Sequence, residues 1–155
     1  IKNIGLLLFL ILSTLSFSYQ VNYDDVVDIV LRNYPQSRVT KIEISNYKGK
    51  TVYEGETFNK GQKIEFIINV NTGEVYKMDP NYDDEYNPSY NLPITFEQAS
   101  RIALDNSFNG KVKSIELKNI DKKAYYTVGV KEDKSEKEMN IDANSGKILN
   151  IKESM

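Results

Sequence analysis

The sequence has no histidine, no cysteine and no tryptophan among its 155 residues. Without histidine and cysteine, the chain cannot build a Ser-His-Asp or Cys-His triad, a His or Cys zinc site, or haem ligation by histidine. The lack of cysteine also excludes disulfide bonds. Because most familiar catalytic chemistry lacks its residues here, we predict that the protein is not an enzyme, has no catalytic residues and uses no cofactor or metal.

An excess of positive charge is also missing. The chain has 20 Lys and Arg against 22 Asp and Glu, which leaves a formal net charge of −2. Nucleic-acid binding depends on a concentrated basic surface, so we expect no nucleic-acid partner. The composition, with 40% hydrophobic and 27% charged residues, is typical of a folded soluble protein.

The first 18 residues, IKNIGLLLFLILSTLSFS, differ from the rest of the chain. Lys2 is followed by an apolar run from Ile4 to Leu12 and by a small-x-small pattern at Ser16 to Ser18, which predicts a secretory signal peptide over 1–18. A transmembrane anchor is the alternative, but the run is shorter than the ~20 residues that span a bilayer. We therefore expect a secreted or periplasmic protein with no stable membrane anchor after cleavage.

An internal repeat follows. An offset of 73 aligns Val21–Asp79 with Ile94–Lys152 without a gap, and 13 of the 59 aligned positions are identical. Identical pairs include Ile42/Ile115, Tyr53/Tyr126 and Gly73/Gly146. Similarity that keeps register over this length predicts two copies of one structural unit. We assign repeat 1 to 21–79, a linker to 80–93 and repeat 2 to 94–155.

Each copy has the pattern of a helix followed by strands. Thr95 and Gln98 form a capping-box signature, and Asn22 is the corresponding cap in repeat 1. After each helix the apolar period changes to two, and Gly73 and Gly146 mark tight turns before a last strand. We predict an α+β fold of two tandem repeats, each with one N-terminal helix packed on a roughly four-stranded antiparallel sheet.

The predicted linker is rich in proline, tyrosine and acidic residues. Its three prolines, which should prevent continuous helix or sheet, are Pro80, Pro88 and Pro93. The oxygen-bearing residues at its start and just before it lack the glycine and the late Glu of a calcium-binding loop, so we expect a solvated acidic segment. These residues are Asp79, Asn81, Asp83, Asp84 and Glu85. Its tyrosines Tyr82, Tyr86 and Tyr90 are predicted to anchor the linker to a domain or to contact a partner.

Four segments of repeat 2 carry a family resemblance: ITFEQASRIAL, KSIELK, YYTVGV and EMNIDANSGKILNIK. Together they resemble the PepSY domain, and repeat 1 is similar to a more divergent copy. The family is known from propeptides of secreted metallopeptidases and from stand-alone envelope or secreted proteins. The resemblance implies a non-catalytic binding module that modulates or inhibits a secreted peptidase by steric binding. The chain has no HExxH motif, so the target would be a separate protein. The alternative is a structural or ligand-binding envelope module with no peptidase target.

Strand alternation predicts which side chains face away from the helices. In repeat 1 the apolar Val52 and Ile67 fall on this outer face, and Tyr125 is the repeat-2 equivalent of Val52. We expect these three residues to contact either the other repeat or an external partner. Glu43 and Glu116, also on this face, are expected to be surface residues rather than an acid-base pair.

The first and last strands of each four-stranded unit would be sheet edges. A partner segment could add there through main-chain hydrogen bonds. Lysines on these strands could instead protect the edges from aggregation, and we favour protection. The lysines concerned are Lys41, Lys113, Lys118, Lys147 and Lys152.

Overall fold

The computed structural model describes residues 19–81, 92–120 and 122–155. Repeat 1 contains α1 (Tyr23–Asn33), β1 (Arg38–Tyr47), β2 (Lys50–Asn59), β3 (Gln62–Asn69) and β4 (Val75–Asn81). Repeat 2 contains α2 (Phe96–Asp105), β5 (Lys111–Ile120), β6 (Lys123–Lys131), β7 (Glu136–Asp142) and β8 (Ile148–Ser154). The predicted order of one helix and four strands in each repeat is confirmed.

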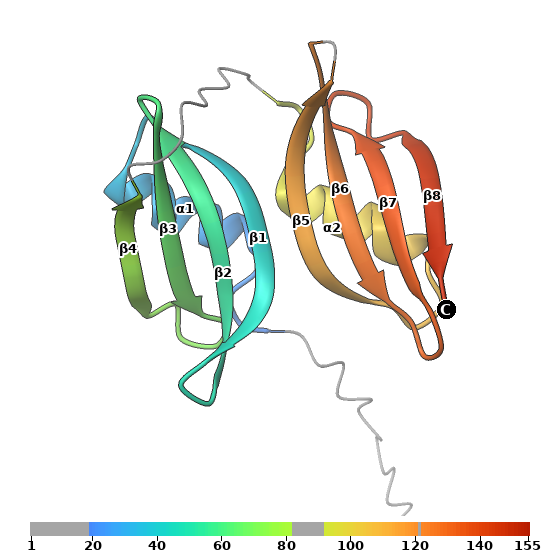
Figure 1. The fold of residues 1–155 in the computed structure, drawn as a ribbon, viewed down its shortest axis with the longest axis horizontal. Helices are drawn as coiled ribbons and strands as arrows, with labels where there is room; N and C mark the ends of the chain where they lie inside the picture. The colour runs from blue at the N-terminus through green and yellow to red at the C-terminus, as the bar shows by residue number, and fades with distance from the viewer. Residues whose placement is uncertain (1–18, 82–91, 121) are drawn as a thin grey trace, which may run out of the picture.

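The eight strands form one antiparallel sheet in the order β4-β3-β2-β1-β5-β6-β7-β8. Both helices lie on the same side of this sheet, which we call the inner face (Figure 1). Neither α1 nor α2, the two helices of the described residues, lies over the opposite side, which we call the outer face. The predicted α+β class is confirmed, but the two four-stranded units are continuous with each other.

The repeats join where β1 pairs with β5. Ile42 of β1 lies opposite Ile115 of β5, and these two residues are repeat equivalents. On either side, Lys41 pairs with Glu116 and Glu43 pairs with Ser114. Because Ile42 faces its own repeat equivalent, the two repeats are related by an approximate two-fold axis that passes through this pair. We call the β1–β5 pairing the seam.

The helices close one core over the inner face. Buried side chains from both repeats, from Val21 to Ala143, form one cluster. Ile42 and Ile115 at the seam are both 0% exposed. The core therefore runs across the seam instead of forming a separate core in each repeat, as the prediction of two tandem units implied.

A tyrosine links the sheet to each helix N-terminus. The hydroxyl of Tyr53 on β2 donates to the carbonyl oxygen of Val21, and that of Tyr126 on β6 donates to Ile94 at 2.6 Å. Burial raises the pKa of both tyrosines above the ordinary value. Each hydroxyl thus stays protonated and holds the chain just before the helix.

The helix starts agree with the predicted caps. The Thr95 hydroxyl accepts from the Gln98 amide at 3.2 Å, and the Gln98 side chain accepts from the Thr95 amide at 2.9 Å. Asn22 forms the same capping box with Asp25 at the start of α1. One cap crosses between repeats, because the Glu97 carboxylate of α2 accepts from the Tyr23 amide of α1 at 3.1 Å. This bond helps fix the two helices relative to each other.

The two glycine turns were also predicted correctly. Gly73 has φ 73° and Gly146 has φ 75°, a left-handed conformation that favours glycine. Before each turn, Asn69 or Asp142 accepts hydrogen bonds from the amides two and three residues later. These two bonds lower the pKa of Asp142 below its ordinary value.

The expectation for Pro80, the first residue of the predicted linker, is wrong. Pro80 was expected to exclude sheet structure, yet it lies in β4 opposite Ile64 of β3. Because β4 is an edge strand, the missing N–H of a proline can be tolerated there. Tyr82, Tyr86 and Tyr90 lie outside the described residues, as do the predicted signal peptide and the remaining acidic residues of the linker. Among the described residues, no helix is both long and apolar enough to cross a membrane.

Candidate binding surfaces

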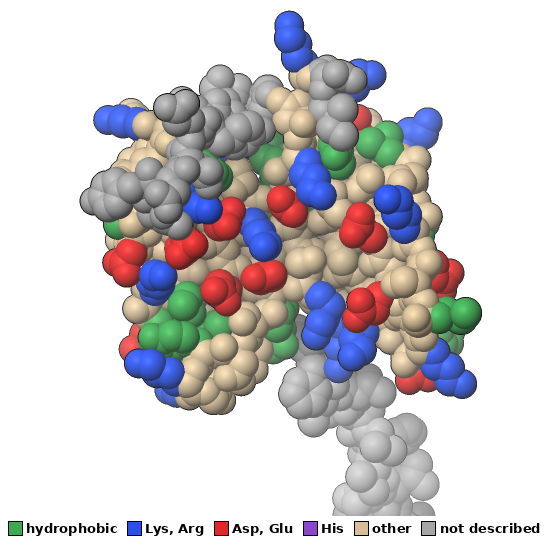
Figure 2. Space-filling model, viewed as in Figure 1, with side chains coloured by type: hydrophobic (Ala, Val, Ile, Leu, Met, Phe, Trp, Pro, Cys, Tyr) green, Lys and Arg blue, Asp and Glu red, His purple; other side chains and the backbone are tan. Residues whose placement is uncertain are grey.

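The outer face of the sheet carries charges of both signs (Figure 2). In repeat 1, carboxylates face each other directly across strands. Glu43 lies opposite Glu54, and Glu65 lies between Glu56 on one side and Asp79 on the other. Like charges directly opposite each other destabilise a sheet. Repeat 1 therefore presents an outer surface that is not arranged for stability alone.

Lysines partly neutralise these carboxylates. The ion pairs join Lys41 to Glu43 at 3.7 Å, Lys63 to Glu56 at 3.9 Å and Lys77 to Glu65 at 3.2 Å. Pairs of this kind near a surface contribute at most ~1 kcal/mol. Glu54 stands among them as a further carboxylate on the rim of a small hollow.

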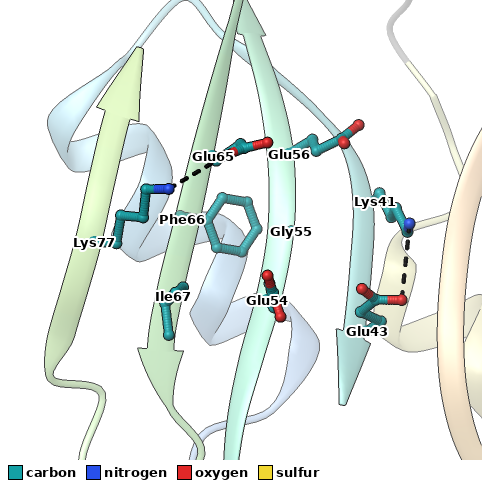
Figure 3. A pocket seen from close by; sticks show the side chains of 9 residues that line it. All are labelled: Lys41, Glu43, Glu54, Gly55, Glu56, Glu65, Phe66, Ile67 and Lys77. Carbon is teal, nitrogen blue, oxygen red and sulfur yellow. Dashed lines mark hydrogen bonds and ion pairs between the residues drawn. The ribbon is translucent and has the colours of Figure 1, made fainter. Parts of the chain in front are cut away.

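The hollow lies on the outer face at Gly55 (Figure 3). A Cβ at this position would lie 2.1 Å from the Lys41 carbonyl oxygen and 2.4 Å from the Phe66 ring, so only glycine fits. The hollow has a volume of about 60 Å³. Ligand pockets are typically ~300 Å³ or larger, so this feature is surface relief rather than a small-molecule site.

Two stacked tyrosines cover part of the outer face of repeat 1. The rings of Tyr47 on β1 and Tyr76 on β4 lie 5.5 Å apart at 30°. Because β2 and β3 lie between these strands, the rings meet above the facing pair Val52 and Asn69. The Asn69 amide also donates to the Tyr76 hydroxyl at 3.0 Å. We call Tyr47 and Tyr76 the tyrosine pair.

The predicted contact residues of repeat 1 are covered within their own repeat. Val52 is 0% exposed and Ile67 is 8% exposed. The prediction that the repeats dock through this face is wrong, because they join side by side at the seam. Alternation placed Val52 correctly on the outer face, but it could not show that tyrosines from two other strands would reach over it. Contact with an external partner stays a prediction.

The equivalent surface of repeat 2 is built differently. Tyr125 replaces Val52 and is half-buried, while Leu149 replaces Tyr76 and is 54% exposed. Ile120 stands where repeat 1 has Tyr47. Repeat 2 therefore has a larger residue than repeat 1 at the Val52 position and a smaller one at the Tyr76 position.

The sheet edges are in part those that the sequence suggested: the last strands β4 and β8 are edges, whereas the first strands β1 and β5 pair with each other. β1 and β5 pair over Lys41–Glu43 and Ser114–Glu116, so Lys41 lies inside the sheet, whereas Lys113 and Lys118 lie on β5 beyond the paired residues. The edges are β4 and β8, and Lys152 lies on β8. Glu43 and Glu116 lie on the two seam strands and face Ser114 and Lys41, which agrees with their expected surface role.

A groove opens on the inner face between α1 and the start of β4, and we call it the α1–β4 groove. It has a volume of about 560 Å³. Its lining residues are Val21, Asp25, Asp28, Ile29, Arg32, Asn33, Thr72, Gly73 and Val75. Sequence reasoning missed it, because the pattern of each element gives no measure of the space between them. Within the described part of the chain, no cluster of three or more acidic residues is arranged to hold a metal ion.

Comparison with known proteins supports the predicted family. The PepSY family, described as "Peptidase propeptide and YPEB domain", matches residues 20–79 and again 93–152. These matches cover more than half of the chain, which therefore belongs to the PepSY family as a tandem-domain member. No curated protein matches the sequence significantly.

One solved structure shares the fold over nearly the whole chain. It is described as a "putative lipoprotein" from Clostridium difficile 630. The TM-score is 0.65 at 23% identity, and the match covers 90% of this chain and 97% of that one. At this identity the likeness concerns the fold, and it shows that the two-repeat architecture occurs in another protein.

Proposed function

We propose that this protein is a non-catalytic binding protein of the secreted or envelope space that restrains a peptidase by steric binding. The family match supports this function, because PepSY domains are described as peptidase propeptide modules. The chain carries two such modules without a zinc-peptidase HExxH motif. We propose that its peptidase target is a separate molecule.

The observation that carries the proposal is the outer face of the eight-stranded sheet, which neither helix of the described residues covers. Strands ~4.8 Å apart make a sheet of eight strands about 38 Å wide, and strands of this length extend about 25 Å. The outer face thus offers on the order of 1,000 Å², whereas a standard protein interface needs ~800 Å² on each partner. The seam makes this surface continuous, so both repeats can contact one target at once.

Charge gives the outer face its selectivity. The facing carboxylates Glu43, Glu54, Glu56 and Glu65 oppose folding in repeat 1, and a partner with basic residues would relieve their repulsion. Complementary charge mainly sets specificity and association rate. A peptidase with a basic rim around its active site fits this surface.

A structural or ligand-binding envelope module is the second candidate function. It is favoured by the solved structure of the same fold, whose protein is described as a "putative lipoprotein". This function requires no peptidase target.

An inhibition assay separates the two functions. The secreted form of the protein is added in equimolar amount to the peptidases that the same cells secrete. We expect one peptidase to lose activity, and we expect Glu54→Lys on the outer face to weaken inhibition. Asp105→Lys, at an exposed position on α2, is the control and should inhibit normally. Full activity of every peptidase would favour the envelope module.

Secretion is tested by the mass of the protein recovered outside the cell. Cleavage after Ser18 would give a product that begins at Tyr19. A recovered product that still contains the apolar run from Ile4 to Leu12 would contradict the signal peptide.

A further inference from the structure

The edge strand β4 has a free side next to the α1–β4 groove. Among the described residues, β4 pairs with β3 only, so no described strand pairs with the main-chain groups on its other side. Val75, which begins β4, is 40% exposed although it is apolar. An edge strand beside a groove can accept an extended peptide, which adds to the sheet while alternate side chains enter the groove.

The groove combines an apolar floor with an acidic rim. Val21, Ile29 and Val75 supply the apolar side chains, while Asp25 and Asp28 are exposed along the α1 side. One oxygen of Asp25 accepts from the Asn22 amide at 2.9 Å as part of the helix cap. Asp28, one turn further along α1, takes no part in that capping box. Arg32 follows near the end of the helix and is the one basic residue among those that line the groove.

Repeat 2 has different residues at the equivalent positions. Val21 and Val75 correspond to the larger Ile94 and Ile148. Contacts around the turn glycine are tighter as well: a Cβ at Gly146 would lie 3.1 Å from Ile102, against 3.4 Å from Ile29 at Gly73. The residues at this position are thus smaller and lie further from the turn glycine in repeat 1.

The charges along the helix are also reversed between repeats. Asp28 of repeat 1 corresponds to Arg101, and Arg32 corresponds to Asp105. Arg101 pairs with Glu97 at 3.4 Å, so that position is already engaged within α2. A segment that suits the acidic groove of repeat 1 would not suit repeat 2.

We propose that the α1–β4 groove binds an extended segment of a partner protein in which aliphatic residues alternate with Lys or Arg. The segment adds to the free side of β4. Its aliphatic side chains pack on Ile29 and Val75, and its basic side chains face Asp25 and Asp28. This inference rests on the proposed function and adds a second contact to the one on the outer face, because it names where a segment of the partner's chain would be held at the β4 edge.

The length of the bound segment follows from the strand. β4 runs for seven residues from Val75 to Asn81, but Pro80 has no N–H to offer near its end. Tyr76 occupies a bulge at the start of β4 and its side chain belongs to the tyrosine pair. About four to six residues of a partner could therefore pair along β4.

The test uses two labelled peptides with the secreted form of the protein. One alternates lysine and valine over six residues, and the other alternates glutamate and valine. By fluorescence anisotropy we expect the lysine peptide to bind at least about tenfold more tightly, because opposite charges attract and like charges repel across a contact. Equal affinity for the two peptides would overturn the proposal.

Two variants in repeat 1 and one matched control locate the site. Val75→Arg should weaken binding of the lysine peptide at least about tenfold, and Asp28→Arg about fivefold. Both positions are exposed, so circular dichroism should remain unchanged. Ile148→Arg at the equivalent position of repeat 2 should leave binding unchanged. Loss of binding with Ile148→Arg alone, or amide shifts in NMR confined to β8, would place the peptide on the other edge and overturn the assignment.

Other occupants have their own signatures. If a second copy of the chain occupies the groove, the protein will sediment as a dimer that Val75→Arg dissociates, and the proposal fails. If peptide binding and its loss in Val75→Arg are observed but no peptidase is inhibited, the groove assignment stands and the proposed function fails. If Val75→Arg abolishes peptide binding yet inhibits a peptidase like the unchanged protein, the function stands and the role of the groove in holding that partner is overturned.

Discussion

Tyr53 of repeat 1 and Tyr126 of repeat 2 make the same bond, to the carbonyl oxygens of Val21 and Ile94. The main-chain bond that returns each helix start to the sheet is also the same, from Val21 to Val70 and from Ile94 to Ala143. Inside the molecule, each repeat thus uses the same two bonds to hold the start of its helix to the sheet. Selection for folding explains this likeness, because these groups are buried in both copies.

The two repeats have similar interiors but different surfaces. Repeat 1 carries the tyrosine pair, the facing carboxylates of the outer face and the open α1–β4 groove. Repeat 2 has Leu149, Thr127 and Ile148 at the corresponding positions. Because neither set is needed to build the shared scaffold, the difference indicates that repeat 1 and repeat 2 meet different surroundings.

The largest expected effect concerns the seam, which both repeats share. Ile115 is fully buried opposite Ile42, so Ile115→Ala should lower the free energy of unfolding by about 2–5 kcal/mol. Ile115→Val, which removes one methylene, should cost about 1 kcal/mol. Urea unfolding measures both changes. Equal costs for the two variants would mean that the side chain is not packed at the seam.

The next effect distinguishes the two outer surfaces. Tyr76→Ala should cost about 2 kcal/mol, because it removes an aromatic stack and uncovers Val52. The equivalent Leu149→Ala should change stability by less than about 0.5 kcal/mol, since Leu149 is 54% exposed. Thermal unfolding of the two variants checks this contrast. A larger loss in Leu149→Ala would show that the surface of repeat 2 is the better packed one.

The tyrosine hydroxyls should give equal effects in the two repeats. Tyr53→Phe and Tyr126→Phe each remove one buried hydrogen bond to a carbonyl oxygen and should each cost about 1–2 kcal/mol. Chemical denaturation of both single variants is the measurement. If the two losses of stability differ by more than about 1 kcal/mol, the two hydrogen bonds are not equivalent.

The smallest effect is a pH dependence that belongs to repeat 2 alone. The Glu132 side chain accepts from Lys137 at 2.8 Å and from the Phe108 amide at 2.7 Å, and these bonds lower its pKa below the ordinary 4.5. A lowered pKa in the folded state stabilises the protein above the ordinary value, and this contribution disappears as the pH falls through the folded value.

Glu132→Gln should therefore flatten the loss of stability in acid. The equivalent residue of repeat 1 is Asn59, so Asn59→Gln is the control and should leave the pH profile unchanged. Melting temperatures between pH 3 and pH 7 measure the effect, a window on either side of the ordinary pKa of ~4.5. Parallel profiles for the unchanged protein and Glu132→Gln would mean that the ion pair does not contribute in solution.

Much of the fold was readable from the sequence because it depends on local signals. The capping residues Thr95 and Gln98, the turn glycines Gly73 and Gly146 and the change of apolar period each act over a few residues. The gap-free offset of 73 then gave the layout of repeat 2 from that of repeat 1. PepSY membership followed from the same segments.

The surfaces were harder to predict because they depend on contacts between distant strands. Alternation places Val52 on the outer face but does not show that Tyr47 and Tyr76 meet above it. In the same way, the sequence of β1 does not show that its free edge pairs with β5. The expectation that Pro80 excludes sheet structure failed for a related reason, since the missing N–H of a proline is acceptable only at an edge position.

The shared sheet is tested most directly by residue-resolved unfolding. In NMR spectra recorded through a urea titration, the amides of β2 and β6 report on the two repeats separately. Because the seam and the core join the repeats, both sets should disappear at one urea concentration, and Ile115→Ala should lower that concentration for both. Two separate midpoints, with Ile115→Ala shifting only that of repeat 2, would contradict a single eight-stranded unit.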